Sequence, residues 1–449
     1  MARSEQGHRG IVSDRYTSSM LLRRFIYTLT MYLLTPVILY RLAVRGLRYP
    51  EYFARWRERF GFFHDPKIHD SVWIHAVSLG EVNAAMPLID ALMQRYQNTP
   101  FVITTVTPTG SERVRRVYGE RVFNVYLPYD LPASIRRFLD RVRPRLAVVM
   151  ETEIWPNLFF ECKARAIPLI VANARLSEKS FRGYGPVRPL AQSALASARY
   201  VAAQSNTDAG RLRDLGAEPE RLGVFGNLKY DMSVPTELKS EAQAMRAEWG
   251  PQRPVWIAAS THEGEEMPAL NAHAAVLRRF PDALLIMVPR HPERFKPVAQ
   301  ECRGFGFRTR TRSEDVNAAP ETQCFVVDAM GELLRCYAAA DVAFVGGSLV
   351  PIGGHNVLEP AALGVPVIVG PQTFNFVEIT ASLIEADAAL RIANAELLGA
   401  AVIKLLADPA LRQRLGSAAR AAFEREQGGV LRTVEVVEKV LGGNGKTPP

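Results

Sequence analysis

Cysteine is scarce in this sequence of 449 residues. Its four cysteines are Cys162, Cys302, Cys324 and Cys336. They form no CxxC pair, and no histidine stands at zinc-ligand spacing from them. These absences exclude a disulfide framework and a structural metal site, so a reducing compartment is the natural location of the chain.

The common nucleotide and metal signatures are also missing. No Gly-Lys-Ser/Thr follows a glycine-rich loop, no GxGxxG follows the first candidate strand, and no Asp-x-Asp occurs. The first two absences argue against ATP and NAD. The third argues against a divalent ion held against a sugar diphosphate. We therefore expect a reaction that uses no metal and no cofactor.

Excess positive charge is absent from most of the chain, although the formal net charge is +9. Residues 1–60 hold eleven arginines and four acidic residues, a net charge of +7, which leaves +2 for all the other residues. A body that grips nucleic acid would spread its charge over a face, so we expect no nucleic-acid partner. The charge instead surrounds one apolar run, residues 25–40, which indicates attachment to anionic membrane lipids.

This run, FIYTLTMYLLTPVILY, has 16 residues and contains Pro36. As a helix it would be about 24 Å long, shorter than a hydrocarbon core of about 30 Å. Arginines flank both of its ends, so the positive-inside rule assigns no orientation. We assign residues 1–46 to an N-terminal tail and membrane anchor, and removal as a signal peptide is the least favoured interpretation. The run could cross the membrane, lie in the headgroup layer, or be a helix covered by protein.

The rest of the chain alternates short β-branched runs with longer amphipathic stretches. This alternation is typical of βα units around a parallel sheet. The predicted strands of the first half are 72–77, 101–105, 122–127, 146–150, 168–172, 200–204 and 222–225. Those of the second half are 255–259, 284–288, 324–327, 342–345 and 366–369.

A polar stretch with several prolines and glycines, residues 231–254, separates the two halves and suits a linker. The predicted fold class is α/β, with two Rossmann-like, doubly wound domains at 47–231 and 232–449 that face a cleft. Such sheets bind ligands at the carboxyl ends of their strands. The chemistry is therefore expected in strand-to-helix loops.

The first strand ends in SLGE (78–81), which places Glu81 in the first turn of a helix. The helix dipole favours the ionised carboxylate there, so Glu81 would be available as a proton acceptor at neutral pH. The plain alternative is an ordinary first-turn glutamate, which is common at this position. Position alone does not separate the two.

Charged residues follow two further strands of the first half. METEIWPN (150–157) places Glu151 and Glu153 at the end of a buried strand, where unpaired carboxylates are costly. A functional role is favoured, and a structural hydrogen-bond hub is the alternative. In FGNLKYD (225–231), Lys229 either meets a phosphate as a point charge or is an ordinary surface lysine.

Two loops of the second half carry groups suited to an anion. PRHPERF (289–295) places Arg290 directly after a strand, where it could pair with a phosphate or stack on a base. His291 is expected to be a hydrogen-bonding partner rather than a metal ligand. GGSLVPIGGHNVLEP (346–360) has four glycines that allow close backbone approach, and a helix beginning near Asn356 would offer its amides to an anion.

Taken in order, these five motifs resemble the 3-deoxy-D-manno-octulosonic acid (Kdo) transferases of lipopolysaccharide assembly. The likeness extends from the apolar N-terminal segment through the second half. It implies a GT-B fold and attachment to the cytoplasmic face of the bacterial inner membrane. It also implies transfer of Kdo from CMP-Kdo to a lipid A precursor (lipid IVA), with inversion at the anomeric carbon.

The resemblance also implies roles for individual residues. Glu81 matches the general base, and Glu151 and Lys229 match residues that stabilise the transition state. Glu359 would receive the ribose hydroxyls. The residues matching segments that bind CMP-Kdo are Pro289, Arg290, Met330, Gly331, Glu332, Asn356, Val357, Leu358 and Glu359.

Two other functions remain open at this point. A nucleotide-sugar epimerase on the same fold would share the cleft and the ribose-binding glutamate. The arginine-rich anchor argues against it, because a soluble sugar nucleotide needs no membrane. A membrane-tethered scaffold without catalysis would keep the motifs only as structure.

Overall fold

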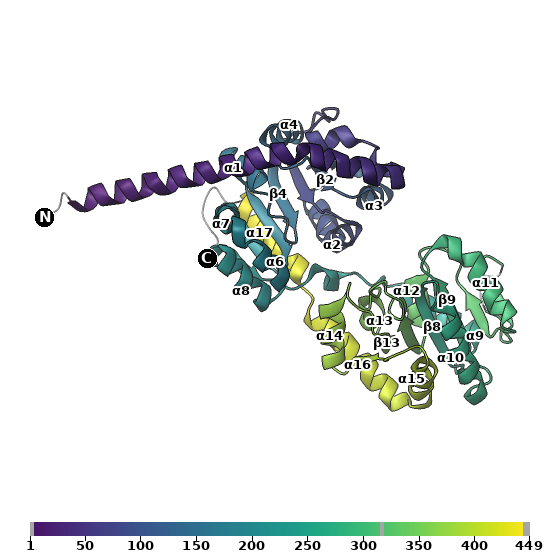
Figure 1. The fold of residues 1–449 in the computed structure, drawn as a ribbon. Helices are drawn as coiled ribbons and strands as arrows, with labels where there is room; N and C mark the ends of the chain where they lie inside the picture. Colours follow the sequence, from purple (N-terminus) through teal and green to yellow (C-terminus); the bar gives the residue numbers. More distant parts are fainter. Residues whose placement is uncertain (1–3, 315–317, 443–449) are drawn as a thin grey trace. The chain divides into compact units, whose positions relative to one another are not determined.

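Two parallel sheets of seven strands organise residues 4–314 and 318–442, which the computed structural model describes (Figure 1). The chain divides into two units. Unit 1 contains Met1–Met232 and Gln427–Pro449, and unit 2 contains Ser233–Glu426. The helices and strands of each unit follow the βα alternation that the sequence predicts.

The sheet of unit 1 has the strand order β3-β2-β1-β4-β5-β6-β7. Its strands are β1 (Ser71–His75), β2 (Phe101–Thr105), β3 (Phe123–Tyr126), β4 (Pro144–Met150), β5 (Leu169–Ala174), β6 (Tyr200–Ala203) and β7 (Leu222–Val224). Its helices are α1 (Ser4–Arg48), α2 (Leu79–Arg95), α3 (Pro108–Tyr118), α4 (Pro132–Val142), α5 (Pro156–Ala164), α6 (Glu178–Gly183), α7 (Arg188–Leu195), α8 (Asn206–Leu215) and α17 (Gly429–Gly442). All seven predicted strands are confirmed, and the strand order reverses between β1 and β4.

The sheet of unit 2 has the order β10-β11-β9-β8-β12-β13-β14 and reverses between β8 and β12. Its strands are β8 (Val255–Thr261), β9 (Leu284–Pro289), β10 (Thr309–Thr311), β11 (Cys324–Val326), β12 (Val342–Val345), β13 (Val367–Val369) and β14 (Ala389–Arg391). Its helices are α9 (Leu238–Trp249), α10 (Glu266–Arg279), α11 (Phe295–Gly304), α12 (Leu333–Ala339), α13 (Leu358–Ala362), α14 (Val377–Glu385), α15 (Leu397–Ala407) and α16 (Pro409–Arg425). The sequence missed β10 and β14, because these three-residue edge strands are only partly buried and carry no long apolar run.

The predicted linker, residues 231–254, contains a helix over half of its length, and the two units divide at its start, between Met232 and Ser233. Within it lies α9, in which four apolar residues are buried, namely Leu238, Ala242, Met245 and Trp249, and the last three pack in a hydrophobic cluster with strands of unit 2. These positions are separated by four, three and four residues, which is helical spacing. The prolines and glycines at both ends of the segment obscured this pattern.

The C-terminal helix α17 belongs to unit 1, whereas the expected second domain ran to the end of the chain. Val436 and Val437 of α17 pack in one of the two hydrophobic clusters of unit 1. The carboxylate of Asp231 accepts the amides of Gly428 at 2.6 Å and Val430 at 2.7 Å. This capping ties the returning helix to the end of the first unit.

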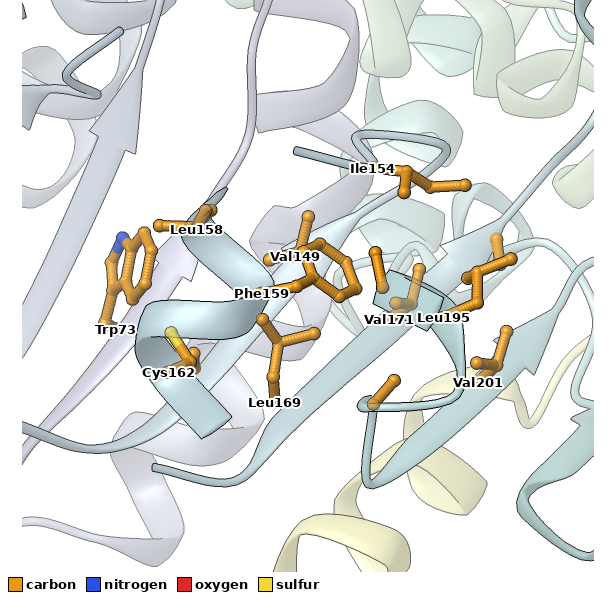
Figure 2. Close-up of a cluster of buried hydrophobic side chains, with 14 of the residues drawn as sticks. Trp73, Val149, Ile154, Leu158, Phe159, Cys162, Leu169, Val171, Leu195 and Val201 are labelled. Atoms are coloured by element: carbon orange, nitrogen blue, oxygen red, sulfur yellow. The ribbon is translucent and has the colours of Figure 1, made fainter. Parts of the chain in front are cut away.

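A hydrophobic cluster on one face of the first sheet holds α5 in place (Figure 2). Leu158, Phe159 and Cys162 of α5 lie against strand residues that include Val149 and Leu169. All three α5 side chains are almost fully buried. The loop between β4 and α5 is therefore anchored at both ends by packed elements.

The N-terminal helix α1 continues through Pro36, which had counted against a clean membrane span. Its Met20–Leu47 part is 28 residues long, and by length and composition alone it is apolar enough to cross a membrane. In Figure 1, the later part of α1 lies along unit 1. The helix is thus longer than the 16-residue run suggested.

One face of α1 is hydrogen-bonded to unit 1. The Arg24 guanidinium donates to the carboxylate of Glu161 at 2.9 Å, and the Tyr27 hydroxyl donates to the carboxylate of Asp130 at 2.8 Å. Asp130 also accepts the amides of Asn157 and Leu158 at the start of α5. Apolar side chains on the other positions are exposed, among them Leu21, Leu22, Phe25, Ile26, Leu29, Leu33, Leu34, Val37, Tyr40 and Val44.

Candidate active site

Glu81 lies where β1 passes into α2, at the point where the strand order of unit 1 reverses. Its carboxylate accepts the amide of Val77 at 2.9 Å and the hydroxyl of Ser78 at 3.2 Å. The Ser78 oxygen in turn accepts the amide of Glu81 at 3.4 Å, which completes a capping box. The plain structural role of a first-turn glutamate is therefore present.

The pKa of Glu81 differs from the expectation based on the helix dipole. It is raised from 4.5 to about 7, chiefly by burial and also by the nearby carboxylates of Glu151 and Glu153, while the hydrogen bonds from Val77 and Ser78 oppose the rise. Desolvation thus outweighs the dipole. A carboxyl with a pKa near the working pH is well matched to proton abstraction.

The loop after β4 brings two more carboxylates to this edge of the sheet. β1 and β4 are neighbouring parallel strands, so their carboxyl ends meet. Glu151 begins the loop in a left-handed conformation, with φ at 55°. Burial also raises the pKa of Glu153, whose carboxylate accepts the indole N–H of Trp155 at 2.7 Å. The structure therefore places Glu151 close enough to Glu81 to raise its pKa, while the catalytic roles of both residues stay predictions.

Lys229 lies in the short 3-10 helix η6 (Leu228–Asp231), which contacts α2. Its backbone amide donates to the side chain of Asn227 at 3.1 Å. The amide of Leu228 donates to the side-chain oxygen of Asn173 at 3.0 Å. Asn173 is a positioning residue that the sequence did not reveal, because it sits inside a strand, where it adopts φ of 54°.

In unit 2, Arg290 follows Pro289, the last residue of β9. Its backbone amide donates to the carbonyl of Thr261 at 3.0 Å. Within the described part of the chain, its guanidinium makes no hydrogen bond or ion pair. A half-buried positive charge without a partner suits an anionic ligand, as the sequence predicts.

The loop after β12 is braced by Glu265, which the sequence interpretation overlooked. Its side chain is fully buried, and its two oxygens accept four backbone amides at 2.6–3.0 Å, those of His262, Gly347, Ser348 and Leu349. Three of these amides belong to the loop that was expected to approach a ligand. They are occupied from within the protein, so these three amides are not free to meet a ligand, and the anion site predicted at the helix start near Asn356 stays a prediction.

The second half of that loop places Asn356 beside Glu359. The Asn356 amide group donates to Glu359 at 3.0 Å and its oxygen accepts the amide of Leu358 at 3.1 Å. Burial raises the pKa of Glu359, and Asn356 and the charge of Arg290 oppose that rise. Helix α13 has only five residues, and the side chains of Val357 and Leu358 are buried. Arg290 and Glu359 therefore share one site.

The turn Met330–Glu332 precedes α12. Met330 is exposed, and Gly331 has φ of 91°, which favours glycine. The carboxylate of Glu332 pairs with Arg335 at 2.9 Å and with Arg312 at 3.6 Å. Among the described residues, no hydrogen bond or ion pair joins this turn to Arg290 or Glu359, so its part in the site stays a prediction.

Two protein-family models match parts of this chain, and relatives of known activity match nearly all of it. The family model described as 3-Deoxy-D-manno-octulosonic-acid transferase (kdotransferase) matches residues 54–232, and that of Glycosyl transferases group 1 matches residues 308–422. A 3-deoxy-D-manno-octulosonic acid transferase of Haemophilus influenzae is 42% identical over 94% of this chain and 99% of its own. One of Bordetella pertussis is 38% identical over 93% of this chain and 100% of its own.

A solved structure, a putative UDP-N-acetylglucosamine 2-epimerase from Listeria monocytogenes, superimposes with a TM-score of 0.53. It is 16% identical and covers 85% of this chain and 98% of its own. At that identity the likeness concerns the fold alone. It agrees with the predicted α/β class of two doubly wound sheets, which is confirmed.

Proposed function

Because this chain belongs to the family of Kdo transferases and is an enzyme that transfers Kdo, we propose that it moves Kdo from CMP-Kdo to a lipid A precursor, lipid IVA, and releases CMP. The observation that carries this proposal is Glu81, whose pKa of about 7 suits a base. A hydroxyl acceptor needs such a group, because proton removal accompanies attack.

In the proposed reaction, Glu81 takes the proton of an acceptor hydroxyl while that oxygen bonds to the anomeric carbon of Kdo. The bond from this carbon to the CMP phosphate oxygen breaks, and its electron pair stays on the phosphate. One base and one displacement give inversion, as in inverting glycosidases. Glu151 and Lys229 stabilise the charge that develops in unit 1.

Unit 2 would hold the donor. Arg290 supplies positive charge for the phosphate of CMP, and Glu359 accepts hydrogen bonds from the ribose hydroxyls. The remaining donor-binding residues are Pro289, Met330, Gly331, Glu332, Asn356, Val357 and Leu358. The guanidinium of Arg290, which has no hydrogen bond or ion pair among the described residues, and the largely buried carboxylate of Glu359 support this assignment, because the two lie close enough to interact electrostatically.

Neither alternative function fits as well. The epimerase structures resemble this chain in fold, whereas the transferases match it at 42% and 38% identity over nearly all of their length. A scaffold without catalysis would have no need of partly buried, neighbouring carboxylates that raise the pKa of Glu81, because burying charge costs stability. The transferase is therefore the function that the site supports best.

Purified full-length protein, incubated with CMP-Kdo and lipid IVA, is expected to release CMP and to add the mass of Kdo to the lipid. Mass spectrometry of the acceptor and chromatography of the nucleotide measure the two products and count the sugars added. CMP release without a gain in lipid mass would point to hydrolysis or another acceptor. A folded protein that gives neither product would end the proposal.

We also propose that α1 rests on the cytoplasmic face of the inner membrane rather than crossing it. Arg24, Tyr27 and Thr28, near the middle of the helix, are bonded to Glu161, Asp130 and Asn157 of unit 1. A helix crossing the bilayer would have to draw these polar groups into hydrocarbon. Its exposed apolar face and flanking arginines instead suit the headgroup layer of anionic lipid.

If α1 lies in the plane of the membrane, the side chains of its exposed face should all reach the same depth in the bilayer. Single cysteines at Leu22, Leu33 and Tyr40, labelled with a fluorophore, are expected to be quenched alike by lipids brominated near the headgroups in anionic vesicles. A label at Leu397 of unit 2 serves as the unquenched control. If Leu33 alone were quenched by bromines at the bilayer centre, the helix would cross the membrane.

A further inference from the structure

Three histidines meet at the carboxyl edge of the second sheet. His262 follows β8, His291 follows β9, and His355 lies in the loop after β12. These strands are neighbours, and the strand order reverses between β8 and β12. The histidines therefore lie where open α/β sheets bind their ligands.

The three rings are in direct contact. The Nε2 atoms of His262 and His355 are 2.8 Å apart, so one ring donates and the other accepts, and the rings are stacked at 5.0 Å. The His291 ring meets His262 edge-on at 5.1 Å. The His355 ring also leaves no room for a Cβ on Gly347, where an added carbon would lie 2.9 Å from the ring. A side chain larger than that of glycine at position 347 would therefore collide with the His355 ring.

The surroundings of the cluster are positive. The pKa of His355 is lowered to about 3, chiefly by burial and also by the charges of Arg290, His262 and His291. Burial, His291 and Arg290 also lower the pKa of His262. Both rings are therefore neutral near pH 7 in the unliganded protein.

The carboxylates near the cluster are occupied by other groups. Glu265 faces the backbone of His262 and the loop amides, and its oxygens hold four N–H groups. Glu359 is bonded to Asn356. Among the described residues, no group of histidine, cysteine and carboxylate side chains is arranged to hold a metal ion. The cluster thus has positive and proton-accepting groups, while the two carboxylates beside it are hydrogen-bonded to other groups.

We propose that His262, His291 and His355 form an oxyanion subsite for the donor, in which one imidazole of the pair takes up a proton as the acidic group binds. The assignment rests on the proposed donor, which carries two such groups, the phosphate of the nucleotide and the carboxylate of the sugar. An arriving negative charge offsets the positive charge of Arg290, which otherwise opposes protonation of a ring. The bound form then holds one more proton than the free form, so lower pH favours binding.

Titration calorimetry of the full chain near pH 7, in two buffers that differ in ionisation enthalpy, measures this proton. CMP is expected to bind with uptake of up to about one proton and with affinity that rises up to about tenfold per pH unit as pH falls from 8 toward 7. Cytidine should bind without uptake. Kdo added to the cytidine-saturated protein distinguishes the sources, because uptake in that arm would assign the subsite to the carboxylate.

His355→Gln is expected to weaken binding roughly tenfold or more and to abolish the uptake. His69→Gln, at an exposed position of unit 1, is the matched control and should change neither. His291→Gln covers the case that the buried variant unfolds, because His291 is exposed, and it should weaken CMP binding. If proton uptake is unchanged in folded His355→Gln, the proposed histidine subsite is wrong, although CMP-Kdo can still be the donor. If folded wild-type protein binds neither CMP nor Kdo, the proposed donor itself is wrong.

Discussion

Glu81→Gln is expected to lower kcat by about 10²-fold or more, because the amide cannot take the acceptor proton. The change keeps the size of the side chain and one acceptor oxygen, so the capping box at the start of α2 is weakened rather than lost. Steady-state release of CMP at saturating CMP-Kdo and lipid acceptor measures the effect. Wild-type turnover in this variant would refute the assignment of the base.

A second capping box in unit 1 provides the control. Asp208, at the third position of α8, exchanges hydrogen bonds with Ser205 in the same way and accepts the amide of Leu176 at 2.8 Å. Asp208→Asn removes the charge of a cap without touching the proposed chemistry. If both variants lost activity alike, in parallel with their stability in urea, the role of Glu81 would be structural.

The pH dependence of the rate distinguishes a catalytic role of Glu81 from a structural one. With a pKa of about 7, Glu81 is mostly protonated below neutrality, so kcat/KM for the lipid acceptor, measured at saturating CMP-Kdo, is expected to fall about tenfold per pH unit below pH 7 and to level off above it. Glu153→Gln removes one of the carboxylates that raise this pKa, so it should move the falling limb to lower pH. If Glu153→Gln leaves the fall in activity below pH 7 at the same pH, a group other than Glu81 controls that fall.

Glu265→Ala is expected to reduce the free energy of unfolding of unit 2 by about 3 kcal/mol or more. The substitution leaves four backbone amides without their acceptor, and buried unpaired N–H groups cost about 1–3 kcal/mol each before relaxation. Urea unfolding followed by the fluorescence of the buried Trp249 and Trp256 measures this loss.

Glu263→Ala is the matched control, because Glu263 is exposed two residues earlier on the same loop. It should change the free energy of unfolding by less than about 0.5 kcal/mol. CMP binding should fall in Glu265→Ala even under conditions where the variant is folded, since the loop from Gly346 to Leu349 loses its brace. Equal stability of the two variants would contradict the role assigned to Glu265.

The positions of the candidate residues at strand ends could be predicted, because a strand buried on both faces is an apolar run of limited length. Such runs located β1, β4, β9 and β12, and parallel topology then put the residues after them at one edge of each sheet. The sequence did not predict elements that are only partly buried or in which buried and exposed residues alternate closely. Edge strand β14 has no long apolar run, and in α9 polar residues separate the buried positions.

The sequence by itself determined the two-sheet α/β class, the apolar arginine-flanked anchor and the strand ends that carry Glu81, Glu151 and Arg290, because these depend on local pattern and strand burial. Only the tertiary structure decided what surrounds those groups. The pKa of Glu81 rises chiefly because the fold buries it, and further because Glu151 and Glu153, about seventy positions away in the chain, lie near it. Glu265 and the histidine cluster likewise became visible only in three dimensions, because burial and hydrogen bonding join segments that are distant in the chain.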